Sequence, residues 1–207
     1  MRLKNVKGAN LIIEKGLYYV SNPYENKGIW NKIFKNNNPI YIEIGMGKGD
    51  FIIENALRYP DINFIGIEKF DSVIVRAIQK TNELELNNLL LIKDDALNLD
   101  KVFDKEIDLI YLNFSDPWPK AKHAKRRLTS PIFLNIYDKI FKKDKNIFMK
   151  TDNTGLFEYS LESLSEYGYD ILYKSNDYND EDNIMTEYEK KFREKGININ
   201  KLIAKKK

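Results

Sequence analysis

Short apolar runs alternate with segments of helical periodicity from residue 40 to the end of the chain. This pattern predicts strands at residues 40–44, 63–67, 89–92, 107–112, 146–150, 171–173 and 197–203. Helices are predicted from about residue 50 to Pro60, from an N-cap at Asp71, from Ser130 and Pro131, through Leu156 to Gly168, and from about residue 186 to 195. Such an alternation indicates an α/β fold, a mostly parallel sheet with helices on both faces.

The apolar positions of the first two helices define the side expected to face the core. They are Phe51, Ile52, Ala56 and Leu57 in the first helix, and Val73, Ala77, Ile78 and Leu84 in the second.

Length and composition limit the class of protein. With 207 residues, 43% of them apolar and 31% charged, the chain has room for one ordinary domain with a core. It has no cysteine and one histidine, which excludes disulfides and a cysteine nucleophile and argues against a metal site or a histidine-based triad. No apolar run approaches the ~18 residues of a membrane span, and the N-terminus lacks the form of a signal peptide. We therefore expect a cytoplasmic protein that binds neither metal nor membrane.

Two segments lie outside the regular alternation. A turn at residues 36–39 separates an expected N-terminal extension, residues 1–39, from a domain over residues 40–207. Residues 114–127 have no apolar periodicity and are predicted to form a loop. Because this loop directly follows a strand, we expect it at the carboxyl edge of the sheet, where open α/β sheets bind ligands.

A glycine-rich turn follows the first predicted strand of the domain. Glu43 is followed by Gly45, Gly47 and Gly49, and glycines here allow a sharp turn and a close approach of the backbone to a ligand. A tight strand–helix turn with no ligand would explain the three glycines equally well. Two acids favour a nucleotide: Glu68 ends the second strand, where a carboxylate can accept hydrogen bonds from ribose hydroxyls. Asp95, after the third strand, could hold an adenine amino group or simply cap the next turn.

The glycine spacing distinguishes two nucleotide cofactors. Dinucleotide sites usually have G-x-G-x-x-G, whereas this chain has G-x-G-x-G followed by Phe51, which resembles the S-adenosylmethionine (SAM) loop of class I methyltransferases. Methyl transfer is therefore favoured over a nicotinamide-dependent reaction.

A stiff loop and a basic run follow the fourth strand. Asp116 lies in Asn-Phe-Ser-Asp-Pro-Trp-Pro-Lys, residues 113–120, where two prolines restrict the backbone and lower the cost of ordering it around a substrate. The alternative is a turn in which Trp118 anchors the core. The basic residues Lys120, Lys122, Lys125, Arg126 and Arg127, with His123 among them, have the density of a phosphate-binding strip, although charge runs are more often solvated surfaces.

These motifs, taken in order, resemble the bacterial tRNA (guanine-N7)-methyltransferases, from about Trp30 to Leu202. The matching segments are residues 43–49, 66–68, 114–120, His123 with 125–128, 151–153 and the Thr-Glu-Tyr-Glu box at 186–189. The proline–tryptophan loop with its basic tail and the Thr-Glu-Tyr-Glu box are the specific ones. The resemblance implies a seven-stranded class I fold with the last strand antiparallel, and methyl transfer from SAM to N7 of the variable-loop guanine, conventionally guanine 46, of tRNA.

The resemblance also implies roles for residues. Asp116 would be catalytic, and the cofactor would be held by Glu43, Gly45, Gly47, Gly49, Glu68, Asp95 and Asp116. The substrate guanine would be held by Lys120, Asp152, Thr186, Glu187, Tyr188 and Glu189, and the RNA by Lys122, His123, Lys125, Arg126 and Arg127. Lys122 stands where the family usually has arginine, so a phosphate contact there would lose the bidentate fork.

Two of these segments also have a purely structural interpretation. Residues 151–153 could cap a helix, and Thr186 with Glu189 could form a capping box at a helix N-terminus. Either role is compatible with a substrate contact.

The chemistry of guanine N7 agrees with the acidic site residues. N7 carries a lone pair and no proton, so it needs no general base, and the methylated ring is cationic. Alignment with the sulfonium methyl group and carboxylates that stabilise positive charge are then what catalysis requires, and Asp116, Asp152 and Glu189 could supply them.

Three other interpretations remain open from the sequence. A methyltransferase for a small amine or acid would not bind RNA, and an RNA-binding protein that has kept the fold would not bind SAM. A nicotinamide-dependent oxidoreductase is the third. The sequence also leaves open whether the protein is a monomer or a homodimer.

Overall fold

The computed structural model describes residues 8–207. The helices are α1 (Ala9–Glu14), α2 (Trp30–Phe34), α3 (Asp50–Arg58), α4 (Asp71–Thr81), α5 (Leu99–Val102), α6 (Pro131–Ile140), α7 (Thr154–Glu166) and α8 (Glu187–Arg193), with 3₁₀ helices η1 (Pro23–Asn26), η2 (Ala96–Asn98) and η3 (Ala121–Arg126). The strands are β1 (Tyr19–Val20), β2 (Ile40–Ile44), β3 (Asn63–Glu68), β4 (Leu89–Lys93), β5 (Ile107–Asn113), β6 (Phe141–Thr151), β7 (Asp170–Ser175) and β8 (Asn200–Lys206).

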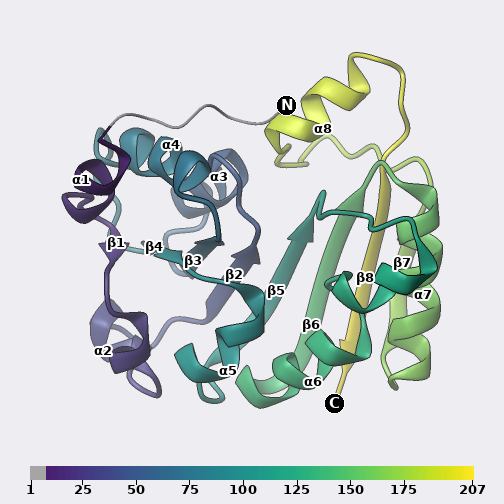
Figure 1. The fold of residues 1–207 in the computed structure, drawn as a ribbon, viewed down its shortest axis with the longest axis horizontal. Coiled ribbons are helices and arrows are strands. Elements are labelled where there is room, and N and C mark those ends of the chain that lie inside the picture. Colours follow the sequence, from purple (N-terminus) through teal and green to yellow (C-terminus); the bar gives the residue numbers. More distant parts are fainter. Residues whose placement is uncertain (1–7) are drawn as a thin grey trace.

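All eight strands form one sheet in the order β1-β4-β3-β2-β5-β6-β8-β7 (Figure 1). The first six strands of this order are parallel, and β8 is antiparallel to both neighbours, β6 and β7. The predicted α/β fold and the antiparallel last strand are confirmed. There are eight strands instead of seven because the two-residue strand β1 adds to the edge beside β4. A run of two residues gives no recognisable period in a sequence.

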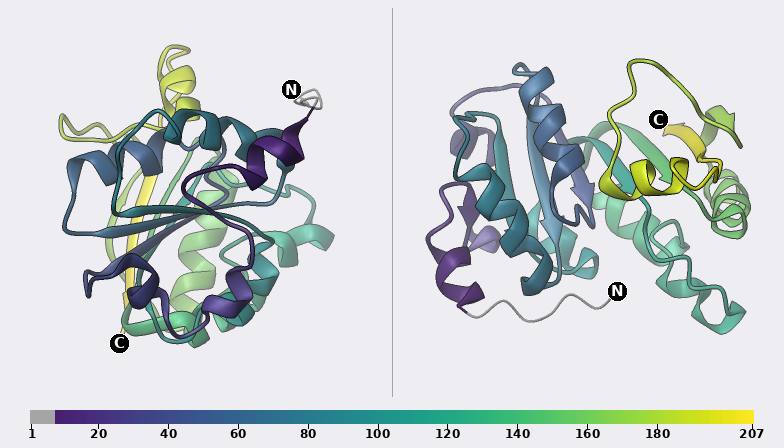
Figure 2. Two further views of the ribbon diagram at one scale, coloured as in Figure 1. Left: turned by 90° about the vertical axis from the view of Figure 1, so that its left-hand side faces the viewer. Right: turned by 90° about the horizontal axis from the view of Figure 1, so that it is seen from above.

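Two apolar clusters join the helices to the two faces of the sheet. One apolar cluster joins α2, α5, α6 and α7 to one face and includes Ile42, Ile110 and Ile147 of the sheet. A second cluster joins α1, α3 and α4 to the opposite face over β3 and β4. Seen from above, α8 lies between α3 and α4 on one side and α7 on the other (Figure 2). In Figure 1 it lies beyond the end of the sheet to which β5 points.

The expected N-terminal extension contributes to the core. Trp30 is fully buried; its ring packs 5.3 Å from that of Phe103, and its Nε1 donates a hydrogen bond to the Val102 carbonyl at 2.9 Å. Residues 1–7 of this expected extension lie outside the described residues. Within the described part of the chain, no helix has the length and hydrophobicity to span a membrane.

Several local predictions were wrong. Leu57, in the last turn of α3, is 52% exposed and does not face the core. Asp71 is the first helical residue of α4 and not its N-cap, because its carboxylate pairs with Lys93 at 2.6 Å instead of capping the backbone. The segment predicted as a loop contains η3, and the last strand begins at Asn200 instead of residue 197.

The strand order fixes where a site can form. Neighbours of β2 are β3 on one side and β5 on the other, so the chain leaves β2 and β5 in opposite directions along the sheet. Ligands of open α/β sheets bind at the carboxyl ends of strands at such a switch point. The glycine turn follows β2 and the Asp116 loop follows β5, which places both motifs there.

Candidate active site

The glycine turn between β2 and α3 is held in a left-handed backbone conformation. Gly45, Gly47 and Gly49 have φ of 77°, 60° and 81°, which side chains rarely allow. At Gly49 a Cβ would also lie 3.0 Å from the Ala77 Cβ, so glycine is needed there for the close packing of α3 on α4. A Cβ at Gly47 would meet nothing within 4 Å. The turn therefore leaves an open cradle beside the ends of β2 and β3.

Glu68, at the end of β3, is fixed against this cradle by backbone groups. Its Oε2 accepts from the Gly47 N–H at 3.1 Å, and its Oε1 accepts from the N–H groups of Lys69 and Phe70 at 2.9 and 3.0 Å. Burial raises the pKa of Glu68, and these backbone donors offset only part of that rise. The carboxylate is thus held in a fixed position beside the open cradle.

Glu43 lies deeper, on β2, and is almost fully buried. Its Oε1 accepts from Asn113 Nδ2 at 2.9 Å, while its Oε2 is buried with no hydrogen-bond partner in the described structure. Burial raises the pKa of Glu43 to about 8, against the opposing effects of Asn113 and Lys150. Glu43 therefore links β2 to β5 and offers one unused oxygen below the glycine turn.

Asp95 is the N-cap of η2 and accepts from the Leu97 N–H at 3.0 Å. It also pairs with Lys69 Nζ at 2.5 Å. Partial burial raises the pKa of Asp95, but the hydrogen bonds from Lys69 and Leu97 outweigh it and hold the pKa below its usual range. The structural role that the sequence left open for Asp95 is thus present. If Asp95 also contacts adenine, its carboxylate has to bond both the exposed Lys69 and the adenine amino group.

The Asp116 loop is strained and held from outside. Phe114 and Trp118 have positive φ, 51° and 42°, a conformation that costs a non-glycine residue ~1–3 kcal/mol. Arg127 supports the loop by donating from Nε to the Pro117 carbonyl and from Nη2 to the Trp118 carbonyl, both at 3.1 Å. A strained backbone persists only where the surrounding structure holds it in place. Here the hydrogen bonds from Arg127 hold the loop, and the Asp116 side chain remains exposed.

Asp116 itself is exposed, and no side chain or backbone N–H among the described residues hydrogen-bonds to it. Its charge is among those that raise the pKa of Glu68, so the two carboxylates lie near each other. Asp152 follows β6, the neighbour of β5, and lies between Thr151 and the helix N-cap Asn153. The capping role predicted for this segment belongs to Asn153, whose Oδ1 accepts from the Leu156 N–H at 2.8 Å.

The basic run divides into two groups. Lys120, Lys122, Lys125 and Arg126 are exposed. Arg126 also lies over the Trp118 ring, 4.8 Å from its centre. His123 is half-buried, with its ring edge against the same tryptophan at 5.9 Å. Arg127 is different, since it is occupied by two loop carbonyls and lies 4.3 Å from the centre of the Tyr159 ring. The guanidinium of Arg127 therefore holds the loop and is less available for a phosphate contact.

The Thr-Glu-Tyr-Glu box forms the start of α8. Thr186 caps the helix, its Oγ1 accepting from the Glu189 N–H at 2.9 Å. Glu189 does not complete the capping box, because its buried carboxylate accepts instead from Lys150 at 2.8 Å, from Asn183 at 2.6 Å and from Arg193. With 0% of Glu189 exposed, the geometry gives it a positioning role.

Glu187 and Tyr188, the other two members of the box, tie α8 to the rest of the site. Glu187 accepts from Lys48 of the glycine turn at 2.8 Å and from Lys191 at 2.5 Å. The hydrogen bonds from these two lysines lower the pKa of Glu187. Tyr188, 56% exposed, stacks on Phe114 of the Asp116 loop with ring centres 6.5 Å apart. These contacts bring the glycine turn, the Asp116 loop and α8 together.

Lys150 was missed by the sequence reasoning. It is buried at the end of β6, where its Nζ donates to Asn183 Oδ1, the Ile184 carbonyl and Glu189 Oε2 at 2.7, 2.8 and 2.8 Å. Burial lowers the pKa of Lys150, against the opposing charge of Glu189. A lysine that closes the apolar run Ile147-Phe148-Met149 was the available signal.

Comparison with known proteins agrees with this geometry. The family model described as "Putative methyltransferase" matches residues 37–202. A tRNA (guanine-N(7)-)-methyltransferase of Bacillus cytotoxicus is 51% identical and aligns over 99% of this chain and 97% of its own length. The enzyme of the same name from Bacillus subtilis is 51% identical over 93% of this chain and 92% of its own.

Solved structures share the fold at low identity. The 16S rRNA methyltransferase KamB superposes with a TM-score of 0.66 at 12% identity, over 85% of this chain and 91% of that one. An antibiotic-related methyltransferase gives 0.65 at 17% identity, over 86% and 92%. The similarity to the Bacillus proteins extends over nearly the whole chain, and the chain belongs to the tRNA (guanine-N(7)-)-methyltransferase family.

Proposed function

We propose that this protein transfers the methyl group of SAM to N7 of the variable-loop guanine, guanine 46, of tRNA. The observation that carries the proposal is the position of Asp116. This free carboxylate is presented by a strained loop, beside the buried Glu68, at the switch point of a methyltransferase-like sheet. Two relatives 51% identical to this chain have the corresponding activity in their names.

The residues present fit SAM. The cradle at Gly47 has room for a ligand, and the Glu68 carboxylate beside it can accept from ribose hydroxyls. The unpaired Oε2 of Glu43 is a buried polar atom below the glycine turn. Asp95 is the proposed partner of the adenine amino group. When bound, SAM supplies a methyl group made electrophilic by its sulfonium.

Catalysis then depends on alignment and charge. The N7 lone pair forms the new N–CH₃ bond as the S–CH₃ bond breaks, so no proton has to be removed. Positive charge passes to the guanine ring, where the Asp116 carboxylate stabilises it without reorganising. The rigid loop that holds Asp116 lowers the entropic cost of placing the base in line with the methyl group.

The same acidic groups support recognition of guanine. Guanine presents N–H donors at N1 and N2, whereas adenine has no hydrogen at N1. Ionised carboxylates only accept hydrogen bonds, so Asp116 and Asp152 match guanine. Lys120 and Tyr188 are the further exposed groups that we assign to the substrate. Thr186, Glu187 and Glu189 support it indirectly, through the cap and ion pairs of α8.

The exposed basic residues of η3 provide the RNA contact. Lys122, Lys125 and Arg126 project from a segment next to the Asp116 loop, where phosphates flanking the target base would pass. A loop guanine turned into the site is unstacked at a cost of at most a few kcal/mol. With tRNA as substrate, we also propose that the enzyme works in the cytoplasm.

Product analysis tests the proposal. The purified enzyme is incubated with methyl-labelled SAM and an unmodified tRNA transcript, which is then digested to nucleosides for mass analysis. The expected label is in 7-methylguanosine, and it disappears when guanine 46 is replaced by adenine. Label in any other nucleoside contradicts the proposed reaction. Absence of label from RNA, with SAM bound, points to a small-molecule acceptor.

A further inference from the structure

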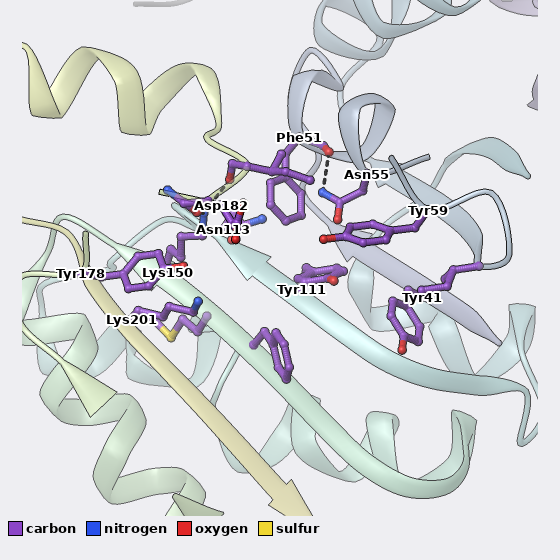
Figure 3. A pocket seen from close by; sticks show the side chains of 15 residues that line it. Tyr41, Phe51, Asn55, Tyr59, Tyr111, Asn113, Lys150, Tyr178, Asp182 and Lys201 are labelled. Carbon is purple, nitrogen blue, oxygen red and sulfur yellow. Dashed lines mark hydrogen bonds between the residues drawn. The ribbon is translucent and has the colours of Figure 1, made fainter. Parts of the chain in front are cut away.

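A second pocket lies on the sheet face that α3 and α4 leave uncovered beyond β2. It has a volume of about 260 Å³, between α3, the strands β5, β6 and β8, and the segment before α8 (Figure 3). None of the residues assigned to SAM, the target guanine or the basic strip lines it. Its volume is below the ~300–1,000 Å³ of typical drug-sized ligand pockets. A pocket of this size suits one nucleotide and not a duplex.

The walls of the pocket are aromatic. Tyr111 of β5 and Phe148 of β6 are register partners, with ring centres 5.8 Å apart and planes at 88°. The Tyr111 ring also makes edge contacts with Phe51 at 5.0 Å and Tyr41 at 6.2 Å. Tyr111 and Phe148 are partly exposed, whereas Ile110 and Ile147, which point to the other face, are buried. The sheet therefore presents fixed aromatic rings to solvent, a surface on which RNA bases stack.

One end of the pocket contains an amide oxygen, Asn55 Oδ1, that accepts no hydrogen bond from the residues that the structure describes. Asn55 is only 3% exposed, and its Nδ2 donates to the Phe51 carbonyl at 2.8 Å. No described residue donates to its Oδ1, which is turned into the pocket near the Tyr59 hydroxyl (Figure 3). This oxygen is accessible from the pocket, so a ligand that donates a hydrogen bond could replace water there. An acceptor beside a hydroxyl can bond the edge of a base.

The pocket lining contains two lysines, Lys150 and Lys201, and one carboxylate, Asp182. Lys150 and Lys201 are cross-strand partners on β6 and β8, an arrangement that like charges disfavour. Lys150 is compensated by Glu189, but no described carboxylate lies within ion-pairing distance of Lys201, whose Nζ is 3.7 Å from the centre of the Tyr178 ring. Burial and then the charge of Lys150 lower the pKa of Lys201, against the opposing charges of Asp180 and Glu189. An anion at Lys201 would relieve this repulsion.

We propose that this pocket binds one unpaired nucleotide of the tRNA substrate, distinct from the target guanine. The base stacks among Tyr59, Tyr111 and Phe148 with its edge at Asn55, and its phosphate lies at Lys201. The inference rests on the proposed function, because it takes tRNA as the substrate. It adds a second anchoring point on a different face of the sheet from the basic strip.

Two variants at opposite ends of the pocket test the inference. Tyr59→Ala removes a half-exposed ring, and Lys201→Gln removes the charge of a lysine that forms no direct ion pair with a described carboxylate. The controls are Tyr24→Ala and Lys143→Gln, which change an exposed tyrosine and an exposed lysine that do not line the pocket. The readouts are the tRNA dissociation constant across salt concentrations, kcat and KM for methyl transfer, and sedimentation velocity without RNA.

Loss of one stacked base is expected to weaken tRNA binding by Tyr59→Ala roughly 5- to 150-fold. Lys201→Gln is expected to reduce the slope of log affinity against log salt by about 0.7, and both variants are expected to raise the KM for tRNA. Wild-type affinity in both variants, while the wild type methylates tRNA, overturns the pocket proposal alone. Loss of self-association in the variants without loss of tRNA affinity also overturns it and assigns this face to a second copy of the chain. A wild type that neither binds nor methylates tRNA overturns the proposed function instead.

Discussion

The cofactor side and the substrate side of the site are built from contacts of different range. On the cofactor side, Gly47 and Glu68 are 21 residues apart and meet through one strand–helix–strand unit. On the substrate side, Lys48 reaches Glu187 across 139 residues, and Lys150 reaches Glu189 across 39. The first side is organised by backbone N–H groups and glycines, the second by side chains on distant elements. Substitutions on the two sides should therefore have separable effects on SAM binding and on methyl transfer.

The largest effect is expected at Asp116. Asp116→Asn keeps the shape but removes the charge that stabilises the cationic ring, so single-turnover methyl transfer should fall on the order of 10²–10³-fold. Binding of SAM and tRNA should change little, because the asparagine amide oxygen can still accept the hydrogen bonds that a ligand offers at this position. Rapid-quench assays with saturating substrates measure the rate, and filter binding measures the affinity. An equal loss of rate and tRNA affinity would contradict the charge role.

The next effect concerns the buried ion pair. Lys150→Met leaves the buried Glu189 with Arg193 as its remaining cation, which should lower the free energy of unfolding by up to about 3–5 kcal/mol. Lys150→Met combined with Glu189→Leu should recover most of that stability. Methyl transfer should stay low in the double variant, since α8 is no longer tied to β6, while SAM affinity stays near wild type. Denaturant unfolding and calorimetry measure the two. Full activity in a stable double variant would show that the pair does not position α8.

The corresponding experiment on the cofactor side changes Glu68. Glu68→Ala removes the ribose acceptor, one hydrogen bond from the glycine turn and two from the backbone of Lys69 and Phe70, and hydrogen bonds of charged groups contribute ~1.5–3 kcal/mol. SAM affinity by calorimetry should fall about 10- to 100-fold, with tRNA affinity unchanged. Asp50→Ala, close by and paired with exposed Lys80, is the control. Unaltered SAM affinity in Glu68→Ala would remove the ribose role.

The basic strip should divide into two classes. Lys122→Ala and Lys125→Ala should each reduce the salt dependence of tRNA affinity by about 0.7–0.9 and leave kcat unchanged. Arg127→Ala should instead lower kcat, because its bonds to Pro117 and Trp118 hold the Asp116 loop. Steady-state kinetics at several salt concentrations separate the two. A pure affinity effect of Arg127→Ala would place this residue with the RNA contacts.

The smallest effect is a pH dependence from Glu43. Because burial raises its pKa from 4.5 to about 8, the folded state binds a proton that the unfolded state releases. The contribution of Glu43 to stability is then complete below about pH 4.5 and is lost as pH rises towards 8. Stability of the wild type relative to Glu43→Gln should therefore fall between these values, measured by urea unfolding. A constant difference would mean that Glu43 ionises normally.

The features that could be predicted from the sequence are those built from local contacts, and those that could not be predicted depend on long-range contacts. The strand–helix alternation, the glycine turn and Glu68 are local, so their positions were predictable from periodicity and spacing. Leu57 was assigned to the core although it is exposed, because helical periodicity alone does not say where a covering element stops. Glu189 was predicted to contact substrate, whereas its burial depends on Lys150 and Asn183, which the sequence does not place nearby. Arg127 likewise was predicted to contact RNA as one of several basic residues in a run. Its hydrogen bonds to the loop carbonyls depend on the folded loop and could not be predicted from the sequence.

The central claim is that the N7 lone pair of guanine is the nucleophile and that the protein only aligns it and stabilises the resulting charge. The most direct test is a tRNA in which guanine 46 is replaced by 7-deazaguanine, so that N7 becomes a C–H group. We expect this RNA to bind with the affinity of the normal tRNA and to accept no methyl group in a single-turnover assay. Methyl transfer to the 7-deazaguanine ring would contradict the account.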